Sequence, residues 1–215
     1  MGDLDQIGYV KAAYRALLPE KLRFRVYRLR HPEYRLEVRL SRLARNGIEG
    51  FMDSLASEGA LMGNVLEIGA GGRGANSKRF SAAARNYWRS DISRWPNSRL
   101  EVSCDCTQMP FKDASLDAVI CSEVLEHVPN LFRAIGELRR VVRPGGRMVL
   151  TMPFFYPLHG VDKKAYGDFW RLTPGNLKLT FGNAFELLRE ETTHLFSSDD
   201  AFVVGVNQLW GRKND

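Results

Sequence analysis

The chain has 215 residues, of which 44% are hydrophobic and 26% charged, and its formal net charge is +6 at pH 7. This length and composition favour one globular domain with a sizeable core and exclude a chain that is disordered throughout. The three cysteines exclude a disulfide-rich scaffold, and Cys104-Asp-Cys106 lacks the two-residue gap typical of zinc sites, so we expect reduced, apolar cysteines.

Residues 1–45 contain the whole excess of positive charge, with eleven Lys or Arg against five acids. Pro19 and Pro32 each suit the first turn of a helix, and leucines recur at near-helical spacing, which predicts amphipathic basic helices. Their apolar stripe can pack on the rest of the protein, or their basic face can bind an anionic membrane surface; RNA is the less favoured partner. No signal-peptide pattern is visible, so we expect a cytoplasmic protein, peripheral to the membrane if these helices bind lipid.

Residues 65–71 predict a ligand site, because a short apolar run ends in a carboxylate and two glycines. The apolar run indicates a buried strand, Gly69 can take a positive φ, and Gly71 lets a ligand approach the main chain. A helix expected over residues 75–85 would direct its first free N–H groups at that ligand. Alone, such a turn is often only a tight strand-to-helix connection.

Further strands and helices alternate along the rest of the chain. A second strand over residues 86–91 ends in Asp91, 24 positions after Glu67 and near the spacing of a ribose-binding acid. Each oxygen of such a carboxylate can accept one hydroxyl of a vicinal diol. Other strand-like segments are residues 100–105, 116–122, 147–152, 185–190 and 201–209. This order predicts an α/β fold, a Rossmann-like doubly wound sheet of seven mostly parallel strands with an antiparallel edge strand.

Several of these segments carry motifs that resemble one family. The motifs are Glu67-x-Gly69-x-Gly71, Asp91, Asp105 with Met109-Pro-Phe111, residues 116–119, Ser122-Glu-Val-Leu-Glu-His-Val128 and Arg143-Pro-Gly-Gly146, the last expected to end a helix in a turn. Together they resemble class I S-adenosylmethionine-dependent methyltransferases of type 11. The resemblance is strong over residues 64–152 and loose elsewhere. One departure is Arg73, which stands where the family has a third glycine, beside Gly74.

The resemblance implies a cofactor, S-adenosyl-L-methionine, and a role for each motif. It implies that the methionine and ribose part of the pocket is shaped by Glu67, Gly69 and Gly71. It implies ribose binding by Asp91, adenine contacts by Asp105 and Cys106, and a wall near the methyl group formed by Ser122 and Glu123. Residues 1–58 are then a basic helical extension and residues 59–215 the methyltransferase domain.

A nicotinamide-dependent dehydrogenase is the rival interpretation of the glycine turn. Gly69, Gly71 and Gly74 also satisfy the spacing of a dinucleotide-binding fingerprint. Glu67 favours the methyltransferase, because a carboxylate two residues before the first glycine would repel a pyrophosphate, whereas S-adenosylmethionine carries an ammonium and a sulfonium.

Residues 153–174 follow the fifth strand and should cover the methyl group, because ligands bind outside the carboxyl ends of parallel strands. Their aromatic and polar residues resemble the corresponding segment of methyltransferases that act on sugars and other small hydroxylated metabolites. We therefore expect O-methylation of a small-molecule, sugar or lipid-linked acceptor, with His159 as the general base and Asp162 and Asp168 behind it. The alternatives are methylation of RNA or protein, and a cofactor-binding module without chemistry.

The motif after the fourth strand is also compatible with a metal-dependent variant. Glu123, Glu126 and His127 would share one face of a helix, and His159 could complete a divalent ion site. Metal-free methyltransferases carry the same motif, so we assign no metal and expect packing and hydrogen bonding for His127.

Overall fold

The computed structural model describes residues 32–71, 75–93, 99–154, 156, 167–182, 184–192 and 206–214. The predicted helices before residue 32, His159 and Asp162 lie outside these ranges. By its contacts the chain divides into two compact units, residues 1–42 and residues 43–215. The second unit carries the sheet and is described below.

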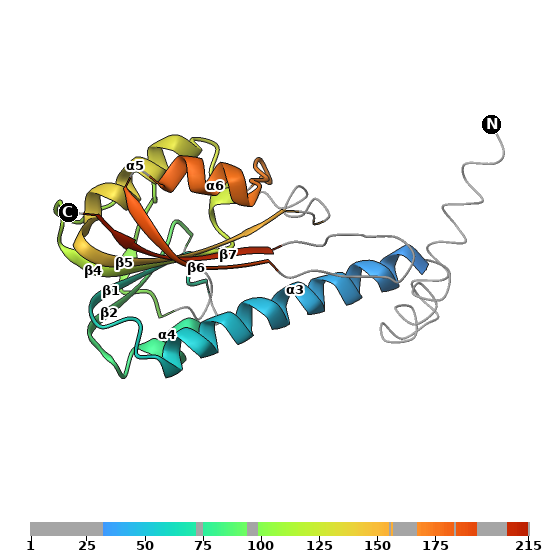
Figure 1. Ribbon diagram of the computed structural model, residues 1–215, viewed down its shortest axis with the longest axis horizontal. Helices are drawn as coiled ribbons and strands as arrows, with labels where there is room; N and C mark the ends of the chain where they lie inside the picture. Colours follow the sequence, from blue (N-terminus) through green and yellow to red (C-terminus); the bar gives the residue numbers. More distant parts are fainter. Residues whose placement is uncertain are drawn as a thin grey trace, which may run out of the picture. The chain divides into compact units, whose positions relative to one another are not determined.

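The second unit is built on a seven-stranded sheet with the strand order β3-β2-β1-β4-β5-β7-β6 (Figure 1). Strands β1 to β5 pair in parallel, whereas β7 runs antiparallel to both β5 and β6. The strands are β1 Gly63–Ile68, β2 Ala84–Asp91, β3 Val102–Ser103, β4 Leu116–Ser122, β5 Val142–Pro153, β6 Phe185–Thr192 and β7 Val206–Lys213. The predicted Rossmann-like, mostly parallel sheet is confirmed, and β7 is its antiparallel strand.

Helices cover both faces of this sheet, as a doubly wound fold requires. They are α3 Pro32–Ser57, α4 Ala75–Phe80, the 3-10 turn η1 Leu125–His127, α5 Leu131–Val141 and α6 Pro174–Phe181. Figure 1 shows α5 and α6 over one face, and α4 with residues 43–57 of α3 over the other. Helix α6 begins at Pro174 because the Thr173 hydroxyl accepts a hydrogen bond from Asn176 N while the Asn176 side chain bonds back to Thr173 N.

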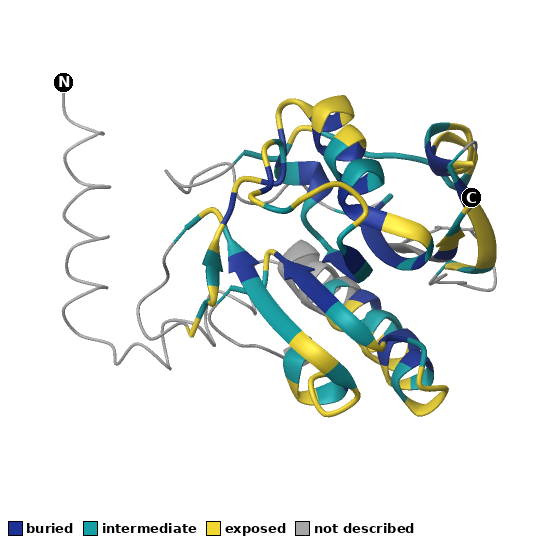
Figure 2. Ribbon diagram, turned by 90° about the vertical axis from the view of Figure 1, so that its left-hand side faces the viewer, coloured by how far each residue is buried: buried dark blue, intermediate teal, exposed yellow. Residues whose placement is uncertain are grey.

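Two apolar clusters form the core, one on each face of the sheet, and alternate residues of each central strand enter different clusters. Leu66, Val119 and Leu150 pack under α5 and α6. Val65, Ile120 and Val149 pack against α4 and the second half of α3. Figure 2 shows these strands as buried ribbons between half-buried and exposed segments. Burial on both faces explains why the sequence of β4 is an almost continuous apolar run.

Several expected boundaries differ from the structure. Strand β2 begins at Ala84 and not at residue 86, β6 ends at Thr192 and not at residue 190, and β7 ends at Lys213 and not at residue 209. Helix α4 ends at Phe80, not at residue 85, because Phe80 is buried in the core and the chain turns back at once into β2. Strand β3 shortens to Val102–Ser103. Residues 143–146 do not end a helix in a free turn. They form an irregularity at the start of β5, where the register against β4 moves from Leu116↔Val142 to Ala118↔Arg147.

The second half of α3 belongs to the core of the sheet-bearing unit. Phe51, Met52 and Leu55 are at most 2% exposed and pack with residues of β1, β4 and β5. The structure therefore divides the chain after Arg42, whereas the sequence interpretation put the boundary after residue 58. An amphipathic stripe alone does not reveal which of its turns is buried.

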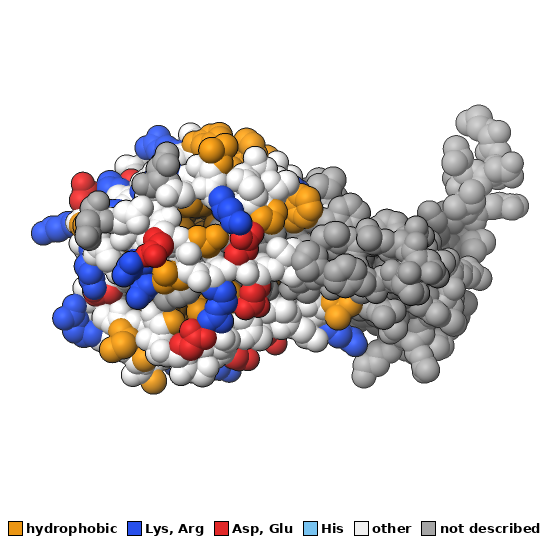
Figure 3. Space-filling model, viewed as in Figure 1, with side chains coloured by type: hydrophobic (Ala, Val, Ile, Leu, Met, Phe, Trp, Pro, Cys, Tyr) orange, Lys and Arg blue, Asp and Glu red, His pale blue; other side chains and the backbone are white. Residues whose placement is uncertain are grey.

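The distribution of charged side chains and the state of the cysteines agree with what the composition predicts. On the face seen in Figure 3, acidic and basic side chains are interspersed over the described residues. Cys104, Cys106 and Cys121 are free and buried, as expected. Within the described ranges, no helix is both long enough and apolar enough to span a bilayer.

We predict that Phe51→Ala lowers the free energy of unfolding by about 3–5 kcal/mol, because it leaves a cavity between α3 and the sheet. Urea unfolding followed by circular dichroism measures this change. Phe132→Ala is the matched control, since Phe132 is 68% exposed, and it should change stability by less than about 1 kcal/mol. Equal effects of the two changes would mean that α3 is not part of this core.

Candidate functional site

A cavity of about 830 Å³ opens at the carboxyl ends of the central strands. This is the edge where ligands bind in open parallel sheets, because the order of the strands reverses there. Its walls come from the turn after β1, the end of β2, the loop after β3, the segment after β4 and residues 167 and 169.

The turn after β1 requires its first glycine for two reasons. Gly69 has φ +70°, a backbone conformation that side chains disfavour, and a Cβ there would lie 2.3 Å from Cγ2 of Val124. Gly71 has φ +55° and lines the cavity. Its N–H donates a hydrogen bond of 3.1 Å to Oδ2 of Asp91. The turn is thus held on one side by β4 and on the other by β2.

Asp91 ends β2 and lines the same cavity. Its second oxygen, Oδ1, accepts a hydrogen bond of 2.9 Å from Ser93 N. Two backbone donors therefore orient the carboxylate. Carboxylate oxygens held in this orientation are suited to accept hydroxyl groups.

The loop after β3 forms the next wall. Oδ1 of Asp105 accepts hydrogen bonds of 2.8 Å from both N and Oγ1 of Thr107, which closes a tight turn. Cys104 and Cys106 lie on the same wall and are buried. Burial raises the pKa of the Cys104 thiol to about 11 and that of the Cys106 thiol to about 12, so both are neutral at pH 7 and act as apolar surface.

Glu67 lies behind the glycine turn and is not among the residues that line the cavity. Its Oε1 accepts from Asn76 Nδ2 and its Oε2 from the Tyr87 hydroxyl, both at 3.0 Å. Burial raises the pKa of Glu67, and the two donors oppose this shift. The carboxyl thus ties β1 to α4 and β2, and its predicted contact with a cofactor stays a prediction.

The segment after β4 contributes Glu123, whereas Ser122 stays outside the cavity lining. Glu123 has φ +54°, which is unusual for a residue with a side chain. Thr151 on β5 holds it at two points, because Thr151 O accepts from Glu123 N and Thr151 Oγ1 donates to Glu123 Oε1, both at 3.0 Å. Ser122 Oγ shares a 2.8 Å hydrogen bond with the same Thr151 hydroxyl.

Residues 167–171, which we call the strap, are fastened to η1. Glu126 O accepts a 2.7 Å hydrogen bond from Phe169 N, and Val128 O accepts a 2.9 Å bond from Trp170 Nε1. His127 Nδ1 lies 2.5 Å from Gly167 O. The η1 segment is a 3-10 turn, whereas the metal-dependent interpretation required an α-helix there. The described residues contain no cluster of three potential metal ligands.

Two of the three predicted general bases, His159 and Asp162, lie outside the described residues. The third, Asp168, is fully buried at its side chain, and both its oxygens accept from the Arg171 guanidinium. That ion pair engages both oxygens of the carboxylate. All three assignments stay predictions.

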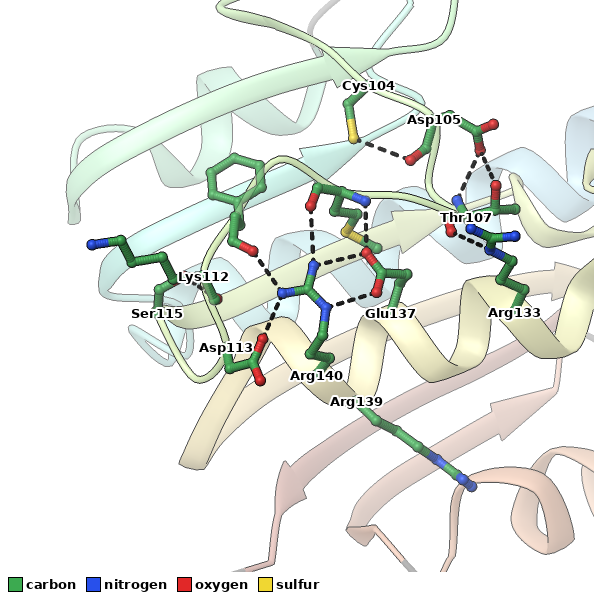
Figure 4. A network of polar contacts seen from close by, with 12 residues as sticks. Cys104, Asp105, Thr107, Lys112, Asp113, Ser115, Arg133, Glu137, Arg139 and Arg140 are labelled. Atoms are coloured by element: carbon green, nitrogen blue, oxygen red, sulfur yellow. Dashed lines mark hydrogen bonds and ion pairs between the residues drawn. The ribbon is translucent and has the colours of Figure 1, made fainter.

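A group of residues on α5 escaped the sequence analysis (Figure 4). Arg140 donates to the carbonyl oxygens of Met109 and Phe111 at 3.0 and 2.7 Å and to Glu137 at 2.6 and 2.8 Å. Glu137 in turn accepts from Met109 N at 2.6 Å, and Arg133 Nε donates to Thr107 O at 3.0 Å. This clamp fixes the cavity-lining loop to the helix. Its signal was the spacing of residues 133, 137 and 140, which puts them on one helix face.

The cavity-lining residues follow the order of the strands. Asp105 comes after β3, Asp91 ends β2, Gly69 follows β1 and Glu123 follows β4, and the sheet order is β3-β2-β1-β4. Neighbouring strands are about 4.8 Å apart, so the row spans roughly 15 Å, a length suited to an adenosyl group with a further substituent. The oriented carboxylate acceptors and the glycine turn fit such a group, as do the neutral thiols at the β3 end of the row. Glu123 lies at the opposite, β4 end.

Comparison with known proteins agrees with this arrangement. Residues 66–150 match the family model described as a methyltransferase domain. The chain is 31% identical over 140 residues to a demethylmenaquinone methyltransferase of Clavibacter sepedonicus, a match that covers 59% of this chain and 56% of that protein. The chain thus spans about half the length of this relative.

Solved structures share the fold at low identity. A 1,6-didemethyltoxoflavin-N1-methyltransferase of Burkholderia thailandensis, with its substrate and S-adenosylhomocysteine bound, has a TM-score of 0.58 at 17% identity, covering 85% of this chain and 90% of that one. The [4+2]-cyclase SpnF has a TM-score of 0.56 at 20% identity, covering 75% and 81%. The second example demonstrates that the fold alone does not define the reaction.

We predict that Arg140→Met loosens the loop over residues 105–111. The change removes five charged hydrogen bonds and should lower the free energy of unfolding by about 2 kcal/mol. Hydrogen exchange should become at least about 10-fold faster at these amides, which is the ratio that a local loss of about 1.4 kcal/mol gives. Arg212→Met, in an exposed ion pair with Glu186, is the control. Unchanged exchange in R140M would contradict the clamp.

Proposed function

Because residues 66–150 form a methyltransferase domain of the S-adenosylmethionine-dependent class, we propose that the chain transfers the methyl group of S-adenosylmethionine to an oxygen of a small-molecule acceptor. The observation that carries this proposal is the row of Asp105, Asp91, Gly69 and Glu123 along one edge of the sheet. Adenine, ribose and the sulfonium end are then bound in that order, and the acceptor enters beside Glu123.

When bound, S-adenosylmethionine supplies an activated methyl group that moves to a nucleophile by in-line displacement. The protein has to hold the two reactants in line and exclude water. Asp91 would accept the ribose hydroxyls, and the loop fastened by Arg140 would contact the base. Val124, Val128 and Phe169 supply the apolar wall that separates the reacting end from solvent.

The residues of this cavity also bear on which chemical class of acceptor can bind. The sequence favours a sugar-like or lipid-linked hydroxyl compound, and the cavity-lining carboxylate of Glu123 supports an acceptor that must lose a proton. A quinone-like acceptor is the second candidate, favoured by the similarity to demethylmenaquinone methyltransferases and by the apolar wall. Docking of residues 1–45 to an anionic membrane would suit either amphiphilic acceptor and is part of the proposal.

We predict that Asp91→Asn weakens S-adenosylmethionine binding about 10- to 100-fold, because the loss of one charge-assisted hydrogen bond amounts to about 1.5–3 kcal/mol. Isothermal calorimetry measures the dissociation constant. Asp53→Asn, in an exposed pair with Arg79, is the matched change and should leave the affinity within about twofold. Equal affinities of both variants would remove Asp91 from the cofactor site.

The activity is tested by release of S-adenosylhomocysteine with three acceptor sets: free and lipid-linked sugars, small phenols and alcohols, and reduced quinones. We expect turnover with members of one set, and mass spectrometry of the product should identify the methylated atom. Methyl on carbon would favour the quinone-like candidate over O-methylation. Tight cofactor binding without turnover in any set would favour a non-catalytic module.

A further inference from the structure

We propose that Glu123 is the catalytic base, the group that takes the proton from the acceptor hydroxyl as the methyl group is transferred. This inference rests on the proposed function and names a residue that the sequence interpretation placed in the wall near the methyl group and considered as a metal ligand. It assigns the proton transfer to Glu123 in place of His159, Asp162 and Asp168.

The position of Glu123 is the first argument. In the row along the sheet edge it stands at the end opposite the loop after β3, two strands beyond Asp91. If Asp91 holds the ribose, a spacing of about 4.8 Å per strand puts Glu123 roughly 10 Å farther along, where the sulfonium end and the acceptor meet. Gly69 and Val124, which are in contact at this point, form the rest of that end.

The way in which the carboxyl group is held is the second argument. Oε1 accepts from the Thr151 hydroxyl, and Thr151 is fully buried and cannot give way. Among the residues that the structure describes, no donor lies within hydrogen-bonding distance of Oε2, and Glu123 lines the cavity. One oxygen is therefore fixed by the protein while the other can meet the acceptor's proton. The left-handed backbone at Glu123 costs free energy of order 1 kcal/mol, and such strain is typical of residues kept for a function.

Electrostatics supplies the third argument. Burial raises the pKa of Glu123 to about 7, and the Thr151 hydrogen bond, Arg171 and Arg45 oppose the shift. Burial, and then the charge of Glu123, raise the pKa of Glu126 well above its ordinary value, which favours the neutral form of that carboxyl group. The facing titratable or charged groups are Cys121 on β4, Glu126 and His127 on η1, Asp168 and Arg171 on the strap, and Arg45 on α3.

A base with a pKa near the working pH is the most effective proton acceptor, because it is largely ionised and still basic. Two other carboxylates nearby are less suited by geometry. Asp91 is held by two backbone N–H groups two strands away, and Asp168 is paired through both oxygens with a guanidinium and does not line the cavity. Glu123 combines access with basicity.

The proton balance is as follows. The acceptor oxygen forms its bond to the methyl carbon while the carbon–sulfur bond breaks, and the electrons of that bond stay on sulfur, which becomes neutral. The hydroxyl proton moves to Oε2 of Glu123, so the carboxylate becomes a neutral carboxyl. The proton then leaves to solvent before the next turnover.

The first test is the pH dependence of kcat for Glu123→Gln, which keeps the shape of the side chain and removes its basicity. Wild-type kcat should fall as the pH drops below about 7, because Glu123 becomes protonated. We expect kcat of E123Q to be at least about 100-fold below that of wild type, and we expect its pH profile to lack the acidic limb, the fall of kcat below pH 7. S-adenosylmethionine affinity at pH 7 should fall only about 5-fold, the factor that corresponds to a shift of about one pKa unit at Glu123 on binding. Glu186→Gln, an exposed carboxyl on β6, is the matched control. A kcat within threefold of wild type, or an acidic limb that persists, overturns the proposal.

The second test does not need an acceptor. A sulfonium beside Glu123 should lower the pKa of its carboxyl, so S-adenosylmethionine binding at pH 7 should release roughly 0.4 proton per site in wild type and E186Q and none in E123Q. Calorimetry in two buffers of different ionisation enthalpy measures this number. Proton release without turnover in any acceptor set would count against the proposed function while supporting the placement of Glu123. Equal proton release in wild type and E123Q overturns the inference even if the enzyme is active.

Discussion

The contact between Gly69 and Val124 is the constraint on which the site depends. Because Gly69 lacks a Cβ, β4 can bring Val124 against the turn after β1, and because it lacks a Cβ it also takes a left-handed φ. That turn delivers Gly71 N to Asp91, which fixes the end of β2 as well. Three neighbouring strands are thus locked together at their carboxyl ends, and the cavity lies where they meet.

The carboxylates around this edge illustrate how surroundings set the role of a residue type. Asp91 and Asp105 each accept from backbone N–H groups, so they are oriented acceptors. Glu67 and Asp168 are bound by partners behind the cavity wall and act as ties between elements. Only Glu123, of these five, lines the cavity with a pKa raised to about 7, since burial outweighs a single hydroxyl bond. Reactivity follows from which donors reach each carboxyl group, and sequence alone does not give this information.

The sequence predicted the elements whose signals are local. Strand β4 has the expected bounds because an almost continuous apolar run buried on both faces leaves little choice of register. The glycine turn, Asp91, Asp105 and Cys106 come together as expected because parallel strands end at one edge. Tertiary packing decided the remainder. Buried Phe80 ends α4 early, and buried Phe51 brings half of α3 into the core. The Arg140 clamp depends on carbonyl oxygens, which no sequence pattern displays.

The strap links recognition of the acceptor to the state of Glu123. Backbone bonds from Phe169 and Trp170 fasten it to η1, and Arg171 at its end is one of the two cations that oppose the raised pKa of Glu123. Phe169, 52% exposed, faces the cavity from the same segment. An acceptor that packs on Phe169 therefore acts on the element that carries this cation. Under the proposed function, an acceptor that packs on Phe169 and excludes water would keep Glu123 buried, and burial is the cause that raises its pKa. Binding of the acceptor and the basicity of Glu123 would then depend on the same structural element.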